Sequence, residues 1–231
     1  MFTVKFIKNI VFNGETIRAI GRSGSPTRVF VQQGDLDGSC SVYCLMMMLI
    51  FYKKLDWEDL TDSERAKESP FVDNIQRQFL YDLRGLCQGG HEMDGLSDKL
   101  NLCFEKKLSE VFTTRPGQYN SVSRPELHQR IKAKLDARKA VLVSFQRKTG
   151  MGHSVVAVGY RKEKRNLLRL FCIDPGRILP YMQMWNNVID IDFLSTDNHE
   201  MTDYNHYEED KICVTELLLI HDKPSELACP F

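Results

Sequence analysis

The amino-acid sequence predicts a single α+β domain over residues 1–231, with helices before an antiparallel sheet. The longest apolar helical run, Val42–Tyr52, lies early, whereas the second half holds short β-branched runs separated by polar turns. This order favours α+β over alternating βαβ units, and no repeat or low-complexity linker divides the chain. We expect an N-terminal β-hairpin extension (1–30), a mainly helical part (31–137) and a mainly β part (138–231).

The N-terminal elements follow from a turn signal and a helix start. Two alternating apolar runs flank Asn13-Gly14, a dipeptide that tolerates positive φ, so Phe2–Ile20 is predicted to be a β-hairpin. Gly21–Pro26 is predicted to be a loop. Ser39 is a suitable N-cap, and the helix that begins at Cys40 is apolar on nearly every side. We therefore expect this helix to be buried.

The middle of the chain predicts three further helical elements. Residues Trp57–Pro70 are charged and irregular, and Phe71–Leu86 has the pattern of an amphipathic helix. Asp94–Phe104 is predicted to be a short helix. Ser123, followed by a proline and a glutamate, is predicted to cap a helix over Leu127–Ala137.

The second half predicts an antiparallel sheet. Its apolar and β-branched runs are separated by polar turns, as is typical of such sheets. The predicted strands are Ala140–Phe145, His153–Tyr160, Leu167–Ile173, Val188–Phe193 and Ile212–Ile220. Asp197–Asp210, which is rich in acids, is predicted to be a mobile loop.

A cysteine and a histidine carry the candidate chemistry. A helix N-terminus favours a thiolate, and Cys40 is predicted to sit at one. Its own N–H can also contribute to an oxyanion hole, with the amide of Gln33 as a second donor. His153 begins a predicted strand and is the candidate base. His221 is the one serious substitute.

A carboxylate can complete this set. Asp174 ends the strand that follows His153, and a turn around Lys162–Asn166 would bring the two side chains together in an antiparallel pair. Cys87 and His91 invite a zinc interpretation, but only Cys103 offers a third soft ligand nearby, so we expect neither a metal nor another cofactor.

The order of these residues resembles that of the papain-like cysteine peptidases. A glutamine precedes the helical cysteine, and Gly-His-Ser-Val-Val-Ala-Val-Gly-Tyr and Asp-Pro follow. The chain is most similar to the bacteriocin-processing peptidase domains of ABC exporters and to their free-standing relatives, which are bacterial. The resemblance implies a papain-like fold in which the nucleophile helix packs on the antiparallel sheet. It also implies that Cys40 is the nucleophile, His153 the base, Asp174 the orienting residue and Gln33 the oxyanion donor.

One position departs from the family pattern. The family's glutamine usually lies six residues before the cysteine, where this chain has Gly34. Gln33 and Gln32 lie one and two positions further away, so the choice between them stays open. The leading hypothesis is a cysteine hydrolase, most readily a peptidase that forms an acyl-thioester at Cys40. The alternatives are a deamidase or transglutaminase-type acyl transferase on the same fold, and a non-catalytic papain-fold interaction module.

The composition limits the kinds of partner that the protein can bind and the cellular compartment in which we expect it. The 31 basic and 31 acidic side chains balance, which argues against nucleic acid as a partner. The longest apolar run is too short to span a membrane, and the N-terminus lacks the pattern of a signal peptide. Seven scattered cysteines are typical of free thiols in a reducing compartment. We expect a cytoplasmic protein that acts on a protein or peptide, with a regulatory protein partner and a leaderless route of export left open.

Overall fold

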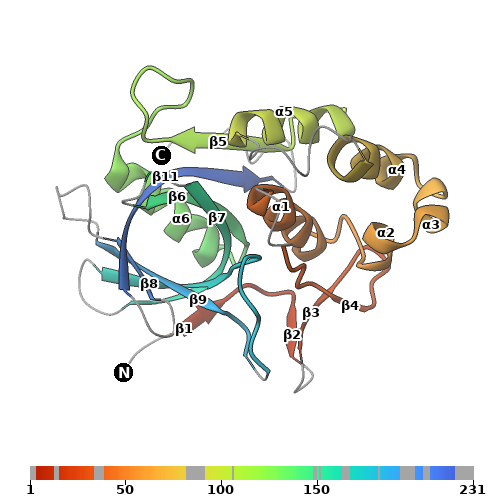
Figure 1. The fold of residues 1–231 in the computed structure, drawn as a ribbon, viewed down its shortest axis with the longest axis horizontal. Coiled ribbons are helices and arrows are strands. Elements are labelled where there is room, and N and C mark those ends of the chain that lie inside the picture. Colours follow the sequence, from red (N-terminus) through yellow and green to blue (C-terminus); the bar gives the residue numbers. More distant parts are fainter. Residues whose placement is uncertain are drawn as a thin grey trace.

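The computed structural model describes residues 4–12, 16–33, 39–81, 92–105, 107–147, 150, 152–162, 167–181, 183–192, 201–204 and 209–221. It contains both helices and a large antiparallel sheet, so the predicted α+β class is confirmed (Figure 1). None of the described helices is both long and apolar enough to cross a membrane.

The helices are α1 (Cys40–Phe51), α2 (Glu58–Thr61), α3 (Ser63–Lys67), α4 (Pro70–Gln76), α5 (Met93–Cys103) and α6 (Arg124–Asp136). The prediction that Trp57–Pro70 is irregular was wrong, because α2 and α3 lie there; both are too short for an apolar period to appear. The predicted helix Phe71–Leu86 is α4 followed by the π-helical segment η1 (Arg77–Tyr81), and residues 82–86 lie outside the described part. Ser123 caps α6 as predicted: its Oγ accepts from the Glu126 N–H at 3.4 Å.

Six antiparallel strands close into a barrel. They are β6 (Val141–Arg147), β7 (Gly152–Lys162), β8 (Leu167–Ile173), β9 (Asn187–Asp192), β10 (Met201–Tyr204) and β11 (Glu209–Ile220). They pair in the order β7-β6-β11-β10-β9-β8, and β8 returns to β7. The prediction of a loop over Asp197–Asp210 was therefore wrong for β10 and for the start of β11; residues 193–200 and 205–208 lie outside the described part.

Two further strands extend the barrel wall. β1 (Val4–Phe6) pairs with β7, and β5 (Ser109–Thr113), which the sequence did not predict, pairs with β11. Gly159 in β7 allows the approach of β1, because a Cβ there would lie 2.5 Å from the Lys5 carbonyl oxygen. A side chain at this position would push the two strands apart.

The N-terminal hairpin is shorter than predicted. β2 (Ile10–Phe12) and β3 (Ile17–Ile20) pair across Asn13-Gly14 as expected, although the turn itself lies outside the described residues. β4 (Pro26–Arg28) adds a third strand. The first residues of the predicted hairpin instead form β1 in the barrel wall, because their backbone pairs with β7, a distant part of the chain.

Helix α1 lies between the barrel and the remaining N-terminal elements (Figure 1). It packs on β6 and β7, and all its residues except Cys40 and Tyr43 are buried, including Met46–Met48. Burying this many apolar side chains, at about 1.5–3 kcal/mol each, fixes the helix firmly against the sheet. The first residue of α1 is thereby held beside the first residues of β7.

Candidate active site

Cys40 is the first residue of α1 and is half-buried. Ser39 occupies the N-cap position without a side-chain capping bond, and its carbonyl accepts from the N–H groups of Val42 and Tyr43 at 2.9 and 3.2 Å. The N–H of Cys40 precedes these donors and has no acceptor within the helix, and the helix dipole is positive at this end. The thiol therefore lies where a negative charge is stabilised.

His153 and Asp174 meet across the β7–β8 pair. His153 is the second residue of β7, and Asp174 directly follows β8, whose Ile173 is paired with Val156. His153 Nε2 lies 2.7 Å from Asp174 Oδ1, and the His153 side chain also hydrogen bonds with Cys40. Because Nε2 faces Asp174, Nδ1 is the ring nitrogen left for the thiol. The structure thus brings Cys40, His153 and Asp174 into one hydrogen-bonded chain.

Asp174 is fully buried and accepts from both sides. Oδ1 accepts from the Gly176 N–H at 2.9 Å as well as from His153. Oδ2 accepts from Asn187 Nδ2 at 2.9 Å and lies 3.2 Å from Arg177 Nε. Four donors therefore converge on one carboxylate, which fixes both its position and its ionised state.

Asn186 holds the backbone of the same residue. The Asp174 N–H donates to Asn186 Oδ1 at 2.6 Å, and Asn186 Nδ2 donates to the Asp174 carbonyl at 2.8 Å. Asn186 immediately precedes β9, and Asn187 is its first residue; β9 is the strand that pairs with β8. Sequence reasoning did not assign these two amides or Arg177 to the site, although the Asn-Asn pair after Trp185 was visible in the sequence.

Electrostatics in this chain favour a thiolate and an imidazolium. Burial opposes ionisation of Cys40, but hydrogen bonds with His153 and Ser154 and the charge of His153 outweigh it and lower the pKa of the thiol. Burial likewise opposes the imidazolium, yet hydrogen bonds and charges from Asp174 and Cys40 raise the pKa of His153 to about 9. Burial would raise the pKa of Asp174, but His153, Arg177 and Asn187 together hold it below its usual value.

Ser154 is a further contact of Cys40 that the sequence did not reveal. It is buried, and both its N–H and its hydroxyl hydrogen bond with the Cys40 thiol. Its Oγ lies 3.1 Å from Ser144 Oγ, and its carbonyl accepts from Cys44 Sγ at 3.2 Å. Cys44 itself is fully buried, and burial together with the charges of Cys40 and Asp174 raises the pKa of its thiol well above the usual value.

Gln33 approaches the same region through its backbone. Its N–H donates to the Pro175 carbonyl at 2.8 Å, so Gln33 lies next to the segment that follows Asp174. The side chain of Gln33 is half-buried, whereas Gln32 is exposed. Residues 34–38, which connect Gln33 to the helix, lie outside the described part.

The rival residues lie elsewhere or have another role. His221 Nε2 is 3.8 Å from Glu110 Oε2 at the end of β11, and the histidine that contacts Cys40 is His153. The zinc candidates Cys87 and His91 lie outside the described residues.

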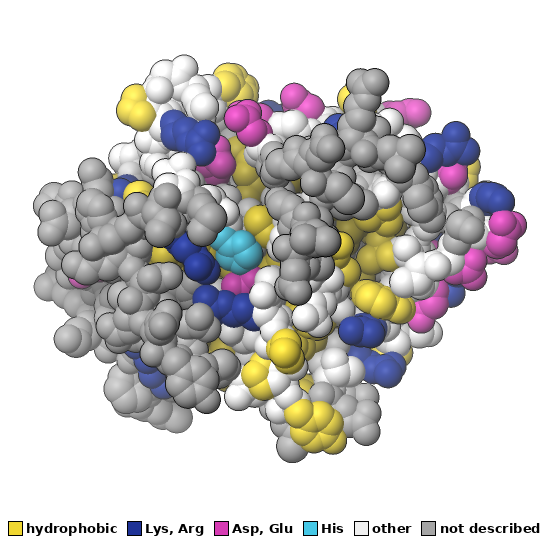
Figure 2. All heavy atoms as spheres, in the orientation of Figure 1, with side chains coloured by type: hydrophobic (Ala, Val, Ile, Leu, Met, Phe, Trp, Pro, Cys, Tyr) yellow, Lys and Arg dark blue, Asp and Glu magenta, His cyan; other side chains and the backbone are white. Residues whose placement is uncertain are grey.

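The surface charge is mixed. Acidic and basic side chains are interspersed on the face drawn in Figure 2, and the described side chains there form no large region of one sign. This distribution agrees with the equal numbers of acidic and basic residues.

Comparison with known proteins assigns the family. No curated protein matches the chain. The model of the Peptidase_C39 like family matches residues 27–188, which is well over half of the chain and includes Gln33, Cys40, His153 and Asp174. The fold and the match together show that the chain belongs to this family of papain-like cysteine peptidases.

Proposed function

We propose that the protein is a cysteine peptidase in which Cys40 is the nucleophile, His153 the acid and base, and Asp174 the orienting residue. The observation that carries this proposal is the hydrogen-bonded chain from the half-buried Cys40 at the N-terminus of α1 through His153 to the buried Asp174. Membership of the peptidase family implies a protein or peptide substrate.

Acylation uses the thiolate and the imidazolium. The Cys40 sulfur forms a bond to the carbonyl carbon of the amide, and the π electrons of the carbonyl move to its oxygen. The N–H of Cys40 is free of helical hydrogen bonding by its position and donates to this oxyanion. When the oxyanion collapses, the carbon–nitrogen bond breaks, and His153 gives its proton to the leaving amine.

Deacylation reverses the roles of the same groups. The now neutral His153 takes a proton from water, whose oxygen attacks the thioester carbonyl. Collapse of the second tetrahedral species breaks the carbon–sulfur bond and returns the thiolate and the imidazolium. Asp174 stays ionised throughout and keeps the imidazole in place through Nε2.

We assign the second oxyanion donor to Gln33 rather than to Gln32. The exposed side chain of Gln32 supports no such role, whereas Gln33 is half-buried and is tied by its backbone to Pro175, next to Asp174. A Gln33→Ala variant should lose turnover while it keeps the pKa of the Cys40 thiol, because an oxyanion donor acts on the substrate oxygen.

Alkylation by iodoacetamide tests the nucleophile without a known substrate. At near-neutral pH, Cys40 should react faster than the other thiols, and His153→Ala should remove this advantage. Cys213 is the internal reference, because it is also half-buried and lies beside a cation, with Arg124 Nη2 3.1 Å from its sulfur. Peptide mapping by mass spectrometry gives the rate at each site. Labelling of Cys40 no faster than of Cys213 would refute the proposal and favour a non-catalytic module.

The fate of the acyl group separates the enzymatic alternatives. A peptidase yields two fragments from a peptide substrate, a deamidase leaves the chain intact and converts glutamine to glutamate, and a transglutaminase joins an added amine to the acyl group. Mass spectrometry of a peptide library incubated with the protein and a primary amine distinguishes the three products. The Cys40→Ala variant is the control for background cleavage.

A further inference from the structure

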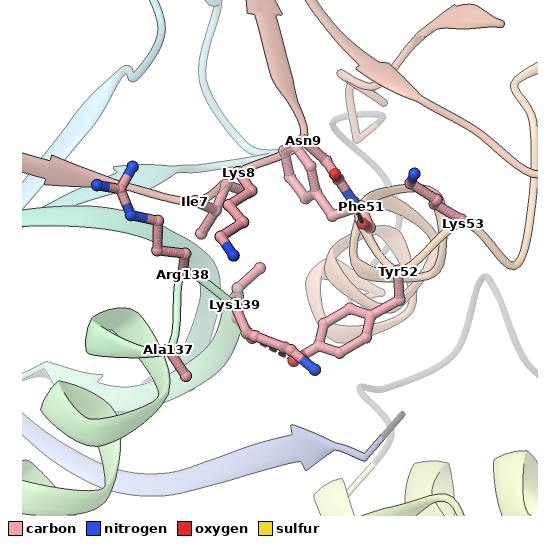
Figure 3. Close-up of a pocket in the computed structure, with 10 residues that line it drawn as sticks. Ile7, Lys8, Asn9, Phe51, Tyr52, Lys53, Ala137, Arg138 and Lys139 are labelled. Atoms are coloured by element: carbon pink, nitrogen blue, oxygen red, sulfur yellow. Dashed lines mark hydrogen bonds between the residues drawn. The ribbon is translucent and has the colours of Figure 1, made fainter. Parts of the chain in front are cut away.

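A basic cavity lies at the end of α1 that is remote from Cys40 (Figure 3). Its volume is about 430 Å³, within the usual size range of small-molecule sites. Since α1 rises about 1.5 Å per residue, the cavity begins about 17 Å along the helix axis from Cys40. It is lined by Ile7, Lys8, Asn9, Phe51, Tyr52, Lys53, Ala137, Arg138, Lys139 and Ala140.

As far as the structure describes the lining, it holds four cations and no carboxylate. Lys8, Lys53 and Arg138 are exposed and Lys139 is half-buried. Among the described residues, no carboxylate forms an ion pair with Lys8, Lys53 or Arg138. In a chain with equal numbers of acidic and basic residues, this is a local excess of positive charge.

The nearest carboxylate along the chain is already engaged. Asp136 binds Lys5 at 2.6 Å and Lys132 at 2.5 Å, and it accepts from the Tyr160 hydroxyl at 2.6 Å. It is absent from the cavity lining. The charge of Asp136 is therefore matched by its own partners and does not neutralise the cavity.

Two of the four cations occupy positions that favour glycine. Lys53 and Arg138 follow the C-terminal residues of α1 and α6 with φ angles of 57° and 59°, and glycine is the residue usually found in such capping turns. Helix α5 ends in the same turn at Glu105, with φ 51°, outside the cavity. The two turns that face the cavity thus carry cations, and the third carries an acid.

The helix ends reduce this positive charge only in part. Each helix C-terminus acts as roughly −0.5 of an elementary charge, so two of them contribute about −1. Lys8, Lys53 and Arg138 alone then leave an excess of roughly +2. The dipoles of the two helices do not explain why four cations gather here, because two cations would already more than balance the negative charge of the helix ends.

Two carbonyl groups in the cavity lining already accept hydrogen bonds from other lining residues. The Phe51 carbonyl accepts from Asn9 Nδ2 at 2.8 Å, and the Ala140 carbonyl accepts from the Tyr52 hydroxyl at 3.1 Å. The Tyr52 ring also lies 5.9 Å from Lys139 Nζ, so it forms a fixed wall of the cavity. Figure 3 shows Lys8 and Lys139 between Arg138 on one side and Lys53 on the other. The cavity therefore presents donors on cationic side chains.

We propose that this cavity binds a small phosphorylated molecule with at least two negative charges. A diphosphate group carries about two to three negative charges, enough to balance the excess of roughly +2. Lysine and arginine are the side chains that most commonly bind phosphate oxygens. The volume accommodates a ligand larger than inorganic phosphate. The proposal does not depend on catalysis at Cys40.

Titration calorimetry with sodium pyrophosphate tests the proposal. The full chain should bind pyrophosphate at low ionic strength, and sodium chloride at matched ionic strength should give no saturable heat. The double variant Lys53→Gly/Arg138→Gly removes two charges, and binding should weaken at least about tenfold. This variant should fold, because glycine adopts positive φ without strain. Its melting curve checks this.

Glu105→Gly is the matched control, since it places glycine in the same kind of turn outside the cavity. Pyrophosphate affinity should stay within about twofold, because an exposed charge outside the cavity is screened. An unchanged affinity in the double variant, or no binding by the wild-type chain, would overturn the proposal. Binding only to vesicles of phosphatidylcholine with phosphatidylserine would overturn it too. Adenosine diphosphate binding more tightly than pyrophosphate would identify a nucleotide, and equal affinity would identify the phosphate groups alone.

Discussion

Replacing Asp174 with asparagine should weaken both the fold and the Cys40–His153 pair. The carboxylate accepts from His153 and Gly176 through Oδ1 and from Asn187 and Arg177 through Oδ2. An asparagine has one amide oxygen, so its NH₂ group must face one of these pairs of donors. Two buried donors then lose their acceptor at about 1–3 kcal/mol each, which lowers the free energy of unfolding by about 2–6 kcal/mol.

The same substitution should change how stability depends on pH. The pKa of His153 is raised from 6.5 to about 9, a difference that corresponds to about 3 kcal/mol. Because the pKa is raised in the folded state, this stabilisation is fully present below pH 6.5 and is lost as the pH rises through about 9. Without the Asp174 charge, the pKa of His153 should fall and the loss should occur at lower pH.

Urea denaturation at several pH values between 6 and 9.5, combined with alkylation of Cys40, measures both effects. Asp190→Asn is the matched control, because Asp190 is a buried partner of Arg169, with oxygen–nitrogen distances of 2.8 and 2.9 Å, on the β8–β9 pair. It should lower stability without changing alkylation at Cys40. If Asp174→Asn kept the wild-type pH dependence and alkylation rate, the proposed role of the carboxylate would be refuted.

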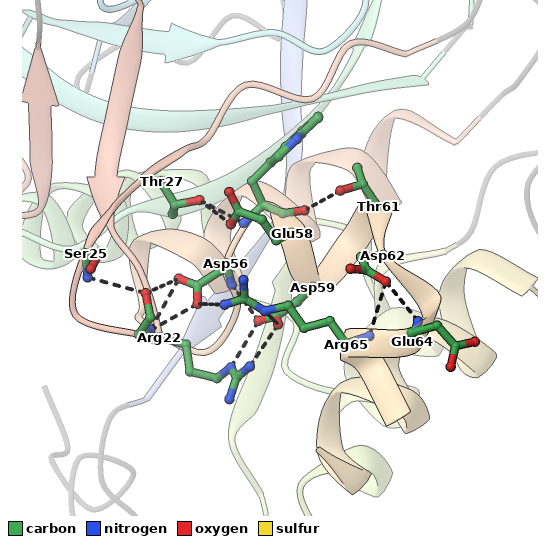
Figure 4. A network of polar contacts seen from close by, with 12 residues as sticks. Arg22, Ser25, Thr27, Asp56, Glu58, Asp59, Thr61, Asp62, Glu64 and Arg65 are labelled. Atoms are coloured by element: carbon green, nitrogen blue, oxygen red, sulfur yellow. Dashed lines mark hydrogen bonds and ion pairs between the residues drawn. The ribbon is translucent and has the colours of Figure 1, made fainter. Parts of the chain in front are cut away.

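Three further substitutions test neighbouring features. Ser154→Ala removes a hydroxyl that hydrogen bonds with the Cys40 thiol, so the pKa from alkylation rates should rise and labelling at pH 7 should slow several-fold; an unchanged pH profile would contradict this. Gly176→Ala places a Cβ 3.3 Å from His153 Cε1 and from Asp174 Oδ1, and should slow Cys40 labelling with little change in melting temperature. Asp59→Asn removes a buried carboxylate that pairs with two partly exposed arginines drawn in Figure 4, and urea denaturation should show a loss of about 1–3 kcal/mol with Cys40 labelling unchanged.

The parts of the fold that the sequence predicted correctly are those with a strong local signal. The apolar run after Cys40 and the β-branched runs of β7 and β8 define their elements without reference to the rest of the chain. Strand direction then accounts for the approach of Asp174 to His153, because in an antiparallel pair of neighbouring strands the end of the second strand lies beside the start of the first.

The features that the sequence did not predict depend on distant partners. β1 pairs with β7 across most of the chain, and the pairing of β6 with β11, on which closure of the barrel also depends, cannot be deduced from periodicity. β10 has four residues and few apolar ones, so it forms only because β9 and β11 flank it. The contact between Ser154 and Cys40 could not be predicted either, because it depends on how the strand that contains the serine packs against α1.

The alternation of charge in the site accounts for the presence of a buried aspartate beside His153. Thiolate, imidazolium, carboxylate and guanidinium follow one another from Cys40 to Arg177, so each charge lies next to one of opposite sign and the four sum to zero. A neutral amide at position 174 would need no counter-ion. A buried carboxylate whose only partner was His153 would become an unpaired buried charge whenever the histidine was neutral. Arg177 supplies that balance on Oδ2, and its side chain is only 16% exposed. The Asp174–Arg177 pair therefore allows the carboxylate to stay ionised when His153 gives up its proton, as the proposed mechanism requires after the amine has left.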